Sequence, residues 1–367
     1  MKEPEERIEF DPTAENEPID FELSPNNSIT LDRIVVEKLF NLFDYDISFK
    51  NDENISILIA PNGCGKTTIL NFINSMVGLG NTSFNKIKDI PFKKFECYFS
   101  NGLKISLFEN KEKVDIAPEY NRSYKIEYGN EIVSQNLYAL YLEYNKYYQE
   151  KRGKNFDSHM IDERSNLNLF LSIRIISTLQ KMAKPYCPTA NYIEANRLKL
   201  EGMVLDKNRD QRLRSILYRY QYSIIHNFRT TRNQQEAKML EQKIKLFKKI
   251  YDDRNRITKK HIEFSKEYGF QIFQNGKEVP PEFLSSGEKN DFYIFFNLIF
   301  PRKNSSITLI DEPEISLHID WQKDFLDYVL EICEMNKSQV IIATHSPDII
   351  NGHIDLYADK KVRLYEE

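Results

Sequence analysis

The sequence has few cysteines and no long apolar run, and each absence excludes a class of protein. Its cysteines form no C-x-x-C pair and show no metal-ligand spacing, which favours reduced thiols over a disulfide scaffold or a cysteine zinc site. No stretch approaches the roughly 18 consecutive apolar residues of a transmembrane helix, and the acidic N-terminus is unlike a signal peptide. We therefore expect a cytoplasmic protein that does not contact a membrane. The cysteines are Cys64, Cys97, Cys187 and Cys333.

An excess of positive charge is also missing. The formal net charge is −4, so the chain is not a globally basic nucleic-acid binder, although a local basic face stays possible. With 367 residues, of which 41% are hydrophobic, the chain is long enough for two or three domain-sized units and a sizeable core.

The first part of the chain has a tail followed by strand patterns. Residues 1–28 combine many acidic residues with prolines, which is typical of a disordered acidic tail. Residues 29–49 alternate between apolar and polar, which predicts edge strands that precede a buried strand at 55–60. A helix is expected at 68–76. An antiparallel β meander is then predicted from short strands at 92–99, 103–108 and 123–128.

Residues 136–260 indicate a mainly helical insertion. Tyrosines recur every third residue from Tyr138, which predicts a helix whose aromatic face we assign to core packing, with base stacking as the alternative. A helix at 235–260 carries one apolar stripe. Residues 197–232 mix basic and aromatic residues, which fits nucleic-acid binding and equally fits a solvated or subunit-contacting helix face. The basic residues are Arg197, Lys199, Lys207, Arg209, Arg212, Arg214, Arg219, Arg229 and Arg232.

A glycine-rich turn follows the buried strand at 55–60 and leads into the next helix. This arrangement leaves backbone N–H groups unpaired at a helix N-terminus, where they and the helix dipole bind phosphate. Lys66 is expected to contact the β- and γ-phosphates, and the Thr67 hydroxyl to ligate Mg²⁺. Ala60 departs from the usual pattern, which has glycine there. The predicted ATP-binding residues are Asn62, Gly63, Cys64, Gly65, Lys66, Thr67 and Thr68.

Two later apolar strands also end in polar residues. Asp311 and Glu312 follow the strand at 305–310, at the C-terminal edge where open α/β sheets bind ligands. We predict that Asp311 holds Mg²⁺ through its water shell and that Glu312 polarises the attacking water, because phosphoryl transfer depends on positioning and charge neutralisation. His345 follows the strand at 339–343. We favour a contact with the γ-phosphate over a purely structural histidine.

Four ordered motifs, APNGCGKTT, LSSGE, LIDEPEISLH and ATHSPDII, resemble those of the ATP-binding-cassette (ABC) ATPases. Within that superfamily the chain is similar to the soluble branch that contains RecF, the SMC-type repair proteins and the OLD-like ATPases of bacterial defence. The resemblance implies an α/β fold of the ABC-type P-loop class, with a central mixed or parallel sheet, an antiparallel β meander and a helical insertion. The predicted division is a tail at 1–28, ATPase parts at 29–135 and 261–367, and the insertion at 136–260.

The resemblance also assigns a role to the LSSGE motif. It implies that Ser285 contacts the γ-phosphate held by the opposite subunit, so that ATP is sandwiched in a head-to-tail dimer or a higher even oligomer. A hairpin made of strands at 262–273 and 278–279 is expected to present this motif. Ser286 replaces the first glycine of the usual L-S-G-G-Q, and Glu288 replaces its glutamine. The predicted contacts with ATP are Ser285, Ser286, Gly287 and Glu288.

Three functions are compatible with such an ATPase. We favour a defence ATPase, similar to those of the Septu or PARIS systems, that controls a separately encoded effector such as a nuclease or toxin. OLD nucleases carry a C-terminal Toprim domain, which we expect this chain to lack because it ends shortly after His345. The alternative is a RecF-like DNA-binding ATPase of repair, which the basic segment at 197–232 supports. A transporter subunit is disfavoured, because its two motifs lie closer together than Lys66 and Ser285.

Overall fold

The computed structural model contains residues of all four motifs. The chain divides into two compact units, Met1–Phe21 with Gly202–Leu284 and Glu22–Glu201 with Ser285–Glu367, and each is considered by itself. The described residues are 29–49, 54–77, 86–110, 121–140, 142–143, 146, 190–194, 224, 226, 233–301, 306–315 and 317–364.

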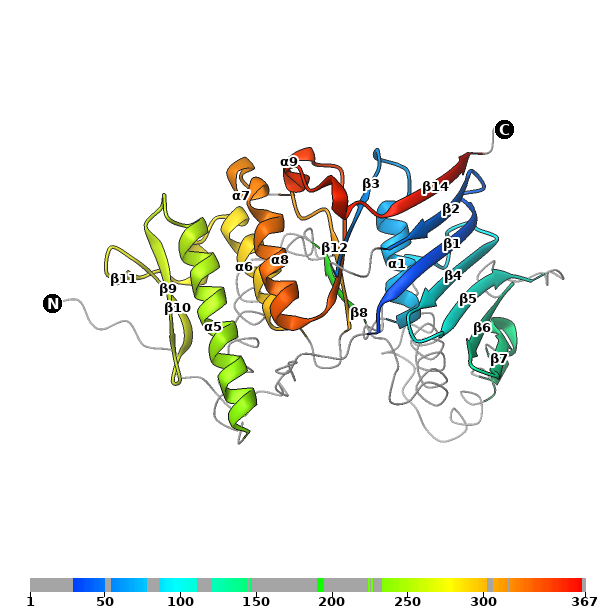
Figure 1. Ribbon diagram of the computed structural model, residues 1–367, viewed down its shortest axis with the longest axis horizontal. Coiled ribbons are helices and arrows are strands. Elements are labelled where there is room, and N and C mark those ends of the chain that lie inside the picture. The colour runs from blue at the N-terminus through cyan, green and yellow to red at the C-terminus, as the bar shows by residue number, and fades with distance from the viewer. Residues whose placement is uncertain are drawn as a thin grey trace. The chain divides into compact units, whose positions relative to one another are not determined.

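A four-stranded parallel sheet lies at the centre of the larger unit (Figure 1). Its strands are buried almost along their whole length, as expected when both faces of a parallel sheet are covered. In spatial order they are β3 (Ile55–Ile59), β13 (Gln339–Thr344), β12 (Ile307–Asp311) and β8 (Ala190–Glu194). The predicted strands at 55–60, 305–310 and 339–343 are therefore confirmed, and their C-terminal ends meet at one edge.

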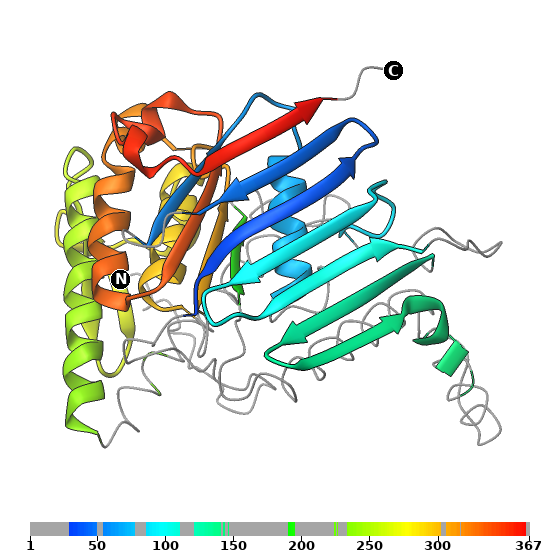
Figure 2. The ribbon, with the colours of Figure 1, turned by 45° about the vertical axis from the view of Figure 1, so that its right-hand side comes forward.

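A seven-stranded antiparallel sheet forms a second layer of the larger unit (Figure 2). The predicted meander is confirmed, with glycine in the left-handed region at the turns around Gly102 and Gly129. In spatial order the strands are β14 (Asp359–Leu364), β2 (Phe43–Ser48), β1 (Leu31–Leu39), β4 (Lys94–Phe99), β5 (Lys104–Glu109), β6 (Arg122–Tyr128) and β7 (Glu131–Asn136).

The prediction that residues 29–49 form edge strands is wrong. β1 lies between β2 and β4, and β2 lies between β1 and β14, so both strands are interior. The physical reason is non-local, because the strand that covers β2 comes from the C-terminal end of the chain. The alternating pattern reports only that one face of these strands is buried.

Helix α1 (Lys66–Val77) packs between the two sheets of this unit (Figure 2). Phe72 stacks on Phe95 of β4 with ring centroids 4.7 Å apart and meets the edge of Phe92 at the same distance. On its other side α1 contacts β8, β12 and β13. The helix that leaves the glycine-rich turn is thus fixed by the main hydrophobic core.

The remaining helices of this unit follow the later motifs. Phe295 of α6 packs on Phe325 of α8 with ring centroids 5.6 Å apart. None of the helices in the described part of the chain is long and apolar enough to cross a membrane. The helices are α6 (Ser286–Ile299), α7 (Ile319–Lys323), α8 (Phe325–Asn336), α9 (Pro347–Ile350) and the 3-10 helix η5 (Ile354–Leu356).

The described part of the smaller unit is one helix with a three-stranded antiparallel sheet. The predicted apolar stripe is confirmed, because Leu240, Ile244, Phe247 and Ile250 are all buried. The helix ends at Arg254 rather than near residue 260, and Asn255 is its C-cap. The elements are α5 (Gln234–Arg254), β9 (Lys260–Ser265), β10 (Gly269–Gln274), β11 (Lys277–Glu278) and the 3-10 helix η4 (Pro281–Phe283).

The predicted single strand at 262–273 is instead two paired strands, β9 and β10. A turn at 266–268 separates them, and Gly269 follows it with φ +73°, a conformation that glycine adopts without strain. The tail at 1–28 and the basic segment at 197–232 lie outside the described residues, apart from Ile224 and His226. The predicted domain division therefore stays a prediction.

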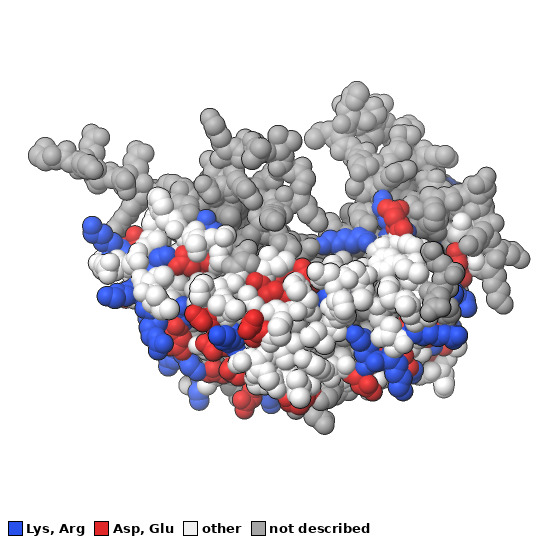
Figure 3. All heavy atoms as spheres, turned by 90° about the horizontal axis from the view of Figure 1, so that it is seen from above, with Lys and Arg blue, Asp and Glu red and all other residues white. Residues whose placement is uncertain are grey.

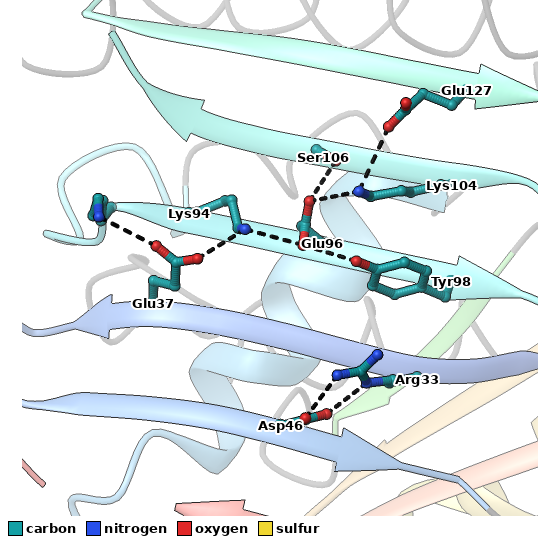
Figure 4. Close-up of polar contacts among 10 residues, drawn as sticks. Arg33, Glu37, Asp46, Lys94, Glu96, Tyr98, Lys104, Ser106 and Glu127 are labelled. Carbon is teal, nitrogen blue, oxygen red and sulfur yellow. Dashed lines mark hydrogen bonds and ion pairs between the residues drawn. The ribbon is translucent and has the colours of Figure 1, made fainter. Parts of the chain in front are cut away.

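A network of charged side chains covers the face of the antiparallel sheet opposite α1 (Figure 4). Its centre is Glu96, whose side chain is 9% exposed and pairs with Lys104 at 2.8 Å and Lys94 at 3.2 Å. The Tyr98 hydroxyl donates to the same carboxylate over 2.9 Å. Burial alone would raise the pKa of Glu96, but the hydrogen bonds from these neighbours outweigh it and lower the pKa below its ordinary value.

The lowered pKa of Glu96 predicts a pH-dependent part of the protein's stability. This part is present above the ordinary pKa of 4.5 and is lost as the pH falls through the lower pKa of the folded state. Replacing Glu96 by Gln should reduce the free energy of unfolding at pH 7 by about 1–3 kcal/mol and flatten its decline below pH 4.5. Urea unfolding across this range measures both effects. Glu131→Gln, at an exposed position of β7, is the control, and equal curves for the two variants would contradict the assignment.

Candidate active site

The glycine-rich turn has the backbone that a phosphate-binding loop requires. Gly63 and Gly65 lie in the left-handed region with φ of +84° and +79°. A Cβ on Gly65 would lie 2.9 Å from Leu39 Cδ2 and 3.1 Å from Phe40 Cε2, so a side chain there would force these neighbours to shift. Ala60 has no positive φ, which explains why the departure from glycine at this position is tolerated.

Lys66 opens α1 and points its ammonium at the loop. The residue is only 7% exposed, and Nζ donates to the carbonyl oxygens of Ala60 at 2.7 Å and Pro61 at 3.2 Å. A buried ammonium needs such partners because its desolvation is costly. The loop is fixed from the other side as well, since the Tyr45 hydroxyl donates to the Cys64 carbonyl oxygen over 2.6 Å. Burial, with a contribution from the nearby Cys64, raises the pKa of Tyr45 to about 12, so this donor keeps its proton.

The residues expected to hold Mg²⁺ lie together at the end of the parallel sheet. The Thr67 hydroxyl donates to Asp311 Oδ1 over 3.0 Å, although the two residues are far apart in the sequence. The second carboxylate oxygen, Oδ2, accepts from the Tyr192 hydroxyl of β8 at 3.1 Å. Asp311 is 5% exposed. A hydroxyl and a carboxylate offer the hard oxygen ligands that Mg²⁺ prefers together with substrate phosphates, so these residues fit the ion.

Glu312 and His345 also lie together, and a second carboxylate joins them. His345 Nδ1 is 3.8 Å from Glu312 Oε1 but only 3.0 Å from Glu314 Oε1, and the His345 backbone N–H donates to this Glu314 oxygen over 3.0 Å. The Glu314 side chain is 7% exposed, whereas that of His345 is 44% exposed. Glu314 therefore holds the imidazole from the protein side while the ring keeps an accessible face.

Glu312 adopts an unusual backbone conformation directly after β12. Its φ is +48°, which is uncommon for a residue with a side chain, and its N–H donates to the Ala343 carbonyl oxygen of β13 over 2.8 Å. The following turn is tied to α6, because the buried Asn290 amide donates to the Ile315 carbonyl oxygen over 2.8 Å. Strained backbone of this kind is often found in active sites.

The LSSGE motif forms the N-terminus of α6. Ser285 is the N-cap, whose hydroxyl accepts from the Glu288 N–H at 3.3 Å, while Glu288 accepts from the Ser285 N–H at 2.8 Å. Ser285 is exposed, and its hydroxyl hydrogen is not used in this capping box. Glu288 is 5% exposed and holds the motif in shape. The helix N-terminus thus presents Ser285, Ser286 and Gly287.

Sequence reasoning found the loop and the strand ends but missed three residues that position them. Tyr192 lies on β8 and Glu314 lies within the DEPE run, and sequence reasoning assigned no role to either residue. Tyr45 lies on β2, and no local pattern connects it with the loop. Among the described residues, no group of three or more His, Cys, Asp and Glu side chains could hold a metal ion.

Comparison with known proteins gives the family. The family model described as "AAA domain, putative AbiEii toxin, Type IV TA system" matches residues 55–351. The Septu protein PtuA of Bacillus thuringiensis is 24% identical over 342 residues, which cover 86% of this chain and 73% of PtuA.

Two solved structures are also similar. Both are Smc head domains, one bound to the C-winged helix domain of ScpA and one, with an extended coiled coil, bound to the C-terminal domain of ScpA derived from Pyrococcus furiosus. Each structure is 12% identical to this chain, with a TM-score of 0.45, and each match covers 92% of this chain. The match covers 98% of the first Smc head domain and 96% of the second. The family model spans both the phosphate-binding loop and the strand ends described above. The chain belongs to the family of ATPases described as AAA domain, putative AbiEii toxin, Type IV TA system.

Proposed function

We propose that this chain is a Mg²⁺-dependent ABC-type ATPase that works as a head-to-tail dimer in the cytoplasm and controls a separately encoded effector in an anti-phage defence system. One observation supports the ATPase activity: the expected site residues all belong to the loop or to strand ends at one edge of the parallel sheet. They are Lys66, Thr67, Asp311, Glu312 and His345. The similarity to PtuA, a Septu protein, supports the role in defence.

The side chains divide the work of hydrolysis among them. Lys66 binds the β- and γ-phosphates, for which it leaves the loop carbonyls. Thr67 and Asp311 hold Mg²⁺, which neutralises charge on the phosphates when bound. Glu312 accepts a hydrogen bond from the attacking water and orients it. His345, held by Glu314, contacts the γ-phosphate. Tyr192 keeps the Asp311 carboxylate turned toward Thr67.

The dimer is proposed because Ser285 is exposed at a helix N-terminus, which is suited to bind a phosphate. In a two-fold arrangement each chain would give its Ser285 to the ATP held by the other. Lys66→Ala and Ser285→Arg variants should each be inactive, and mixing them should restore ATPase activity, because one site of the heterodimer then carries neither lesion.

The control for this mixing experiment combines Lys66→Ala with Glu312→Gln. Lys66 and Glu312 both act on the ATP that is held by their own chain. Each of the two sites in this heterodimer therefore carries one lesion, and no activity should return. Sedimentation of Glu312→Gln with and without ATP gives an independent measurement. No restored activity, together with no ATP-dependent increase in the sedimentation coefficient, would contradict a shared site.

The effector is tested by purifying the protein with its neighbouring gene products from the native operon. We expect a separately encoded enzyme to co-elute, and we expect this chain alone to cut neither DNA nor RNA. Elution of the chain without any partner, both with and without ATP, would contradict this part of the proposal.

A RecF-like role in DNA repair is the second candidate, because residues 197–232 are rich in basic and aromatic residues. On the face drawn in Figure 3, basic and acidic side chains of the described residues lie side by side. The support for this candidate is the composition of residues 197–232. Reversing the charge of Arg212, Arg214 and Arg219 should then abolish a salt-sensitive DNA affinity. If the parent protein binds no DNA at low salt, this candidate is wrong.

A further inference from the structure

The segment that leads into the last described strand, β14, contacts β3, the strand that feeds the phosphate-binding loop. Residue Tyr357 bridges in parallel to Ile57 of β3, and the Ala358 N–H donates to the Ile57 carbonyl oxygen over 3.0 Å. The chain then continues as β14, which pairs with β2, and Lys360 lies opposite Ile47. This segment therefore passes from the edge of the parallel sheet to the antiparallel sheet next to the loop (Figure 2).

Lys360 reaches the loop from this strand. Its ammonium donates to the carbonyl oxygen of Ile59, the last residue of β3, over 2.8 Å. The next two carbonyl oxygens, of Ala60 and Pro61, accept from Lys66. Two ammonium groups from distant parts of the chain are thus held at three successive carbonyls where the loop begins. One hydrogen bond leaves the Lys360 ammonium with further N–H donors.

Lys360 is partly buried, and burial lowers its pKa. The nearby Cys64 opposes this effect, and Lys66 adds a smaller lowering. Among the described residues, no carboxylate forms an ion pair with Lys360. The neighbouring Lys361 differs, because it lies near Asp46 and helps to lower the pKa of that carboxyl group. The two ammonium groups are held by the adjacent carbonyls of Ile59 and Ala60, so a phosphate bound beside them would interact with both positive charges and offset their mutual repulsion.

We propose that Lys360 is a second phosphate-binding cation of this site, which contacts the phosphates of bound ATP together with Lys66. This inference rests on the proposed ATPase function. It assigns to the C-terminal strand a part in nucleotide binding that no sequence motif indicates. The alternative is that Lys360 only ties β14 to β3 through the Ile59 carbonyl, in which case it affects folding but not affinity for phosphate.

The test compares Lys360→Gln with the matched control Lys361→Gln on the same strand. Glutamine can still donate to the Ile59 carbonyl but carries no charge. Isothermal titration with AMP-PNP, ADP and adenosine, all with Mg²⁺, gives the affinities. Loss of one charge-assisted contact should weaken AMP-PNP and ADP binding by about 10- to 100-fold and leave adenosine binding unchanged. Lys360→Arg should restore most of the affinity, and Lys361→Gln should bind like the parent.

The possible outcomes are distinct. If the parent binds AMP-PNP and Lys360→Gln binds it equally well, the inference is overturned while the proposed function stands. An equal loss for ADP and adenosine would also overturn it, because it would indicate a distorted loop. If the parent protein binds no nucleotide, both the inference about Lys360 and the proposed ATPase function are wrong.

A second experiment uses the parent protein and is independent of how the variants fold. Lysines are methylated with formaldehyde and cyanoborohydride, with and without ADP, and the modified residues are identified by mass spectrometry. ADP should protect Lys360 several-fold and leave Lys361 reactive. Equal modification of Lys360 with and without ADP would overturn the inference.

Discussion

Replacing Lys66 by alanine is expected to abolish ATP binding. The ammonium is the buried positive charge at the N-terminus of α1, and it is already turned toward the loop by the carbonyls of Ala60 and Pro61. In the bound state it would exchange these carbonyls for phosphate oxygens, which form stronger, charge-assisted hydrogen bonds. Its removal should weaken binding by about 100-fold or more, because the loss of a charged partner also leaves the phosphates incompletely neutralised.

Titration of ATP with Mg²⁺ into both proteins measures this loss. Lys93→Ala is the matched control, because the Lys93 side chain is 67% exposed and the residue directly precedes β4 of the antiparallel sheet. Thermal melting without nucleotide shows whether the variant is folded. Equal ATP affinity of Lys66→Ala and the control would contradict the assignment of the glycine-rich turn as a phosphate-binding loop.

The parts of the site that could be predicted are those with a local physical cause. A buried strand, a glycine-rich turn and a helix are consecutive in the chain, and the structure has them in that order as β3, the loop and α1. Asp311 and His345 were predicted at strand ends, and parallel pairing of β12 with β13 brings these ends to one edge. The contact between Thr67 and Asp311 follows from this arrangement.

The parts that could not be predicted depend on pairing between distant segments. Tyr192 bonds to Asp311 because β8 pairs with β12, and Lys360 reaches the loop because β14 pairs with β2. No periodicity in the sequence specifies these partners. The error over the edge strands has the same origin, since alternation shows which face of a strand is buried and not which strand lies beside it.

Replacing Glu312 by glutamine is expected to stop ATP turnover while ATP stays bound. Glutamine has the same size and can occupy the same backbone conformation, with φ of +48°, so the turn after β12 should keep its shape. The change removes the negative charge that orients and polarises the attacking water. Lys66, Thr67 and Asp311 are untouched, so binding in the ground state is retained.

Single-turnover hydrolysis and ATP titration separate the two effects. We expect a fall in rate of about 100- to 10,000-fold with little change in affinity. Glu334→Gln, on an exposed position of α8, is the matched control and should hydrolyse ATP like the parent.

Glu314→Gln gives a further comparison, because its retained carbonyl oxygen can still accept from the His345 N–H, and its rate should fall less than that of Glu312→Gln. Hydrolysis by Glu312→Gln at the parent rate would show that another group orients the water, and the short distance between Glu314 and His345 would make Glu314 the next residue to test.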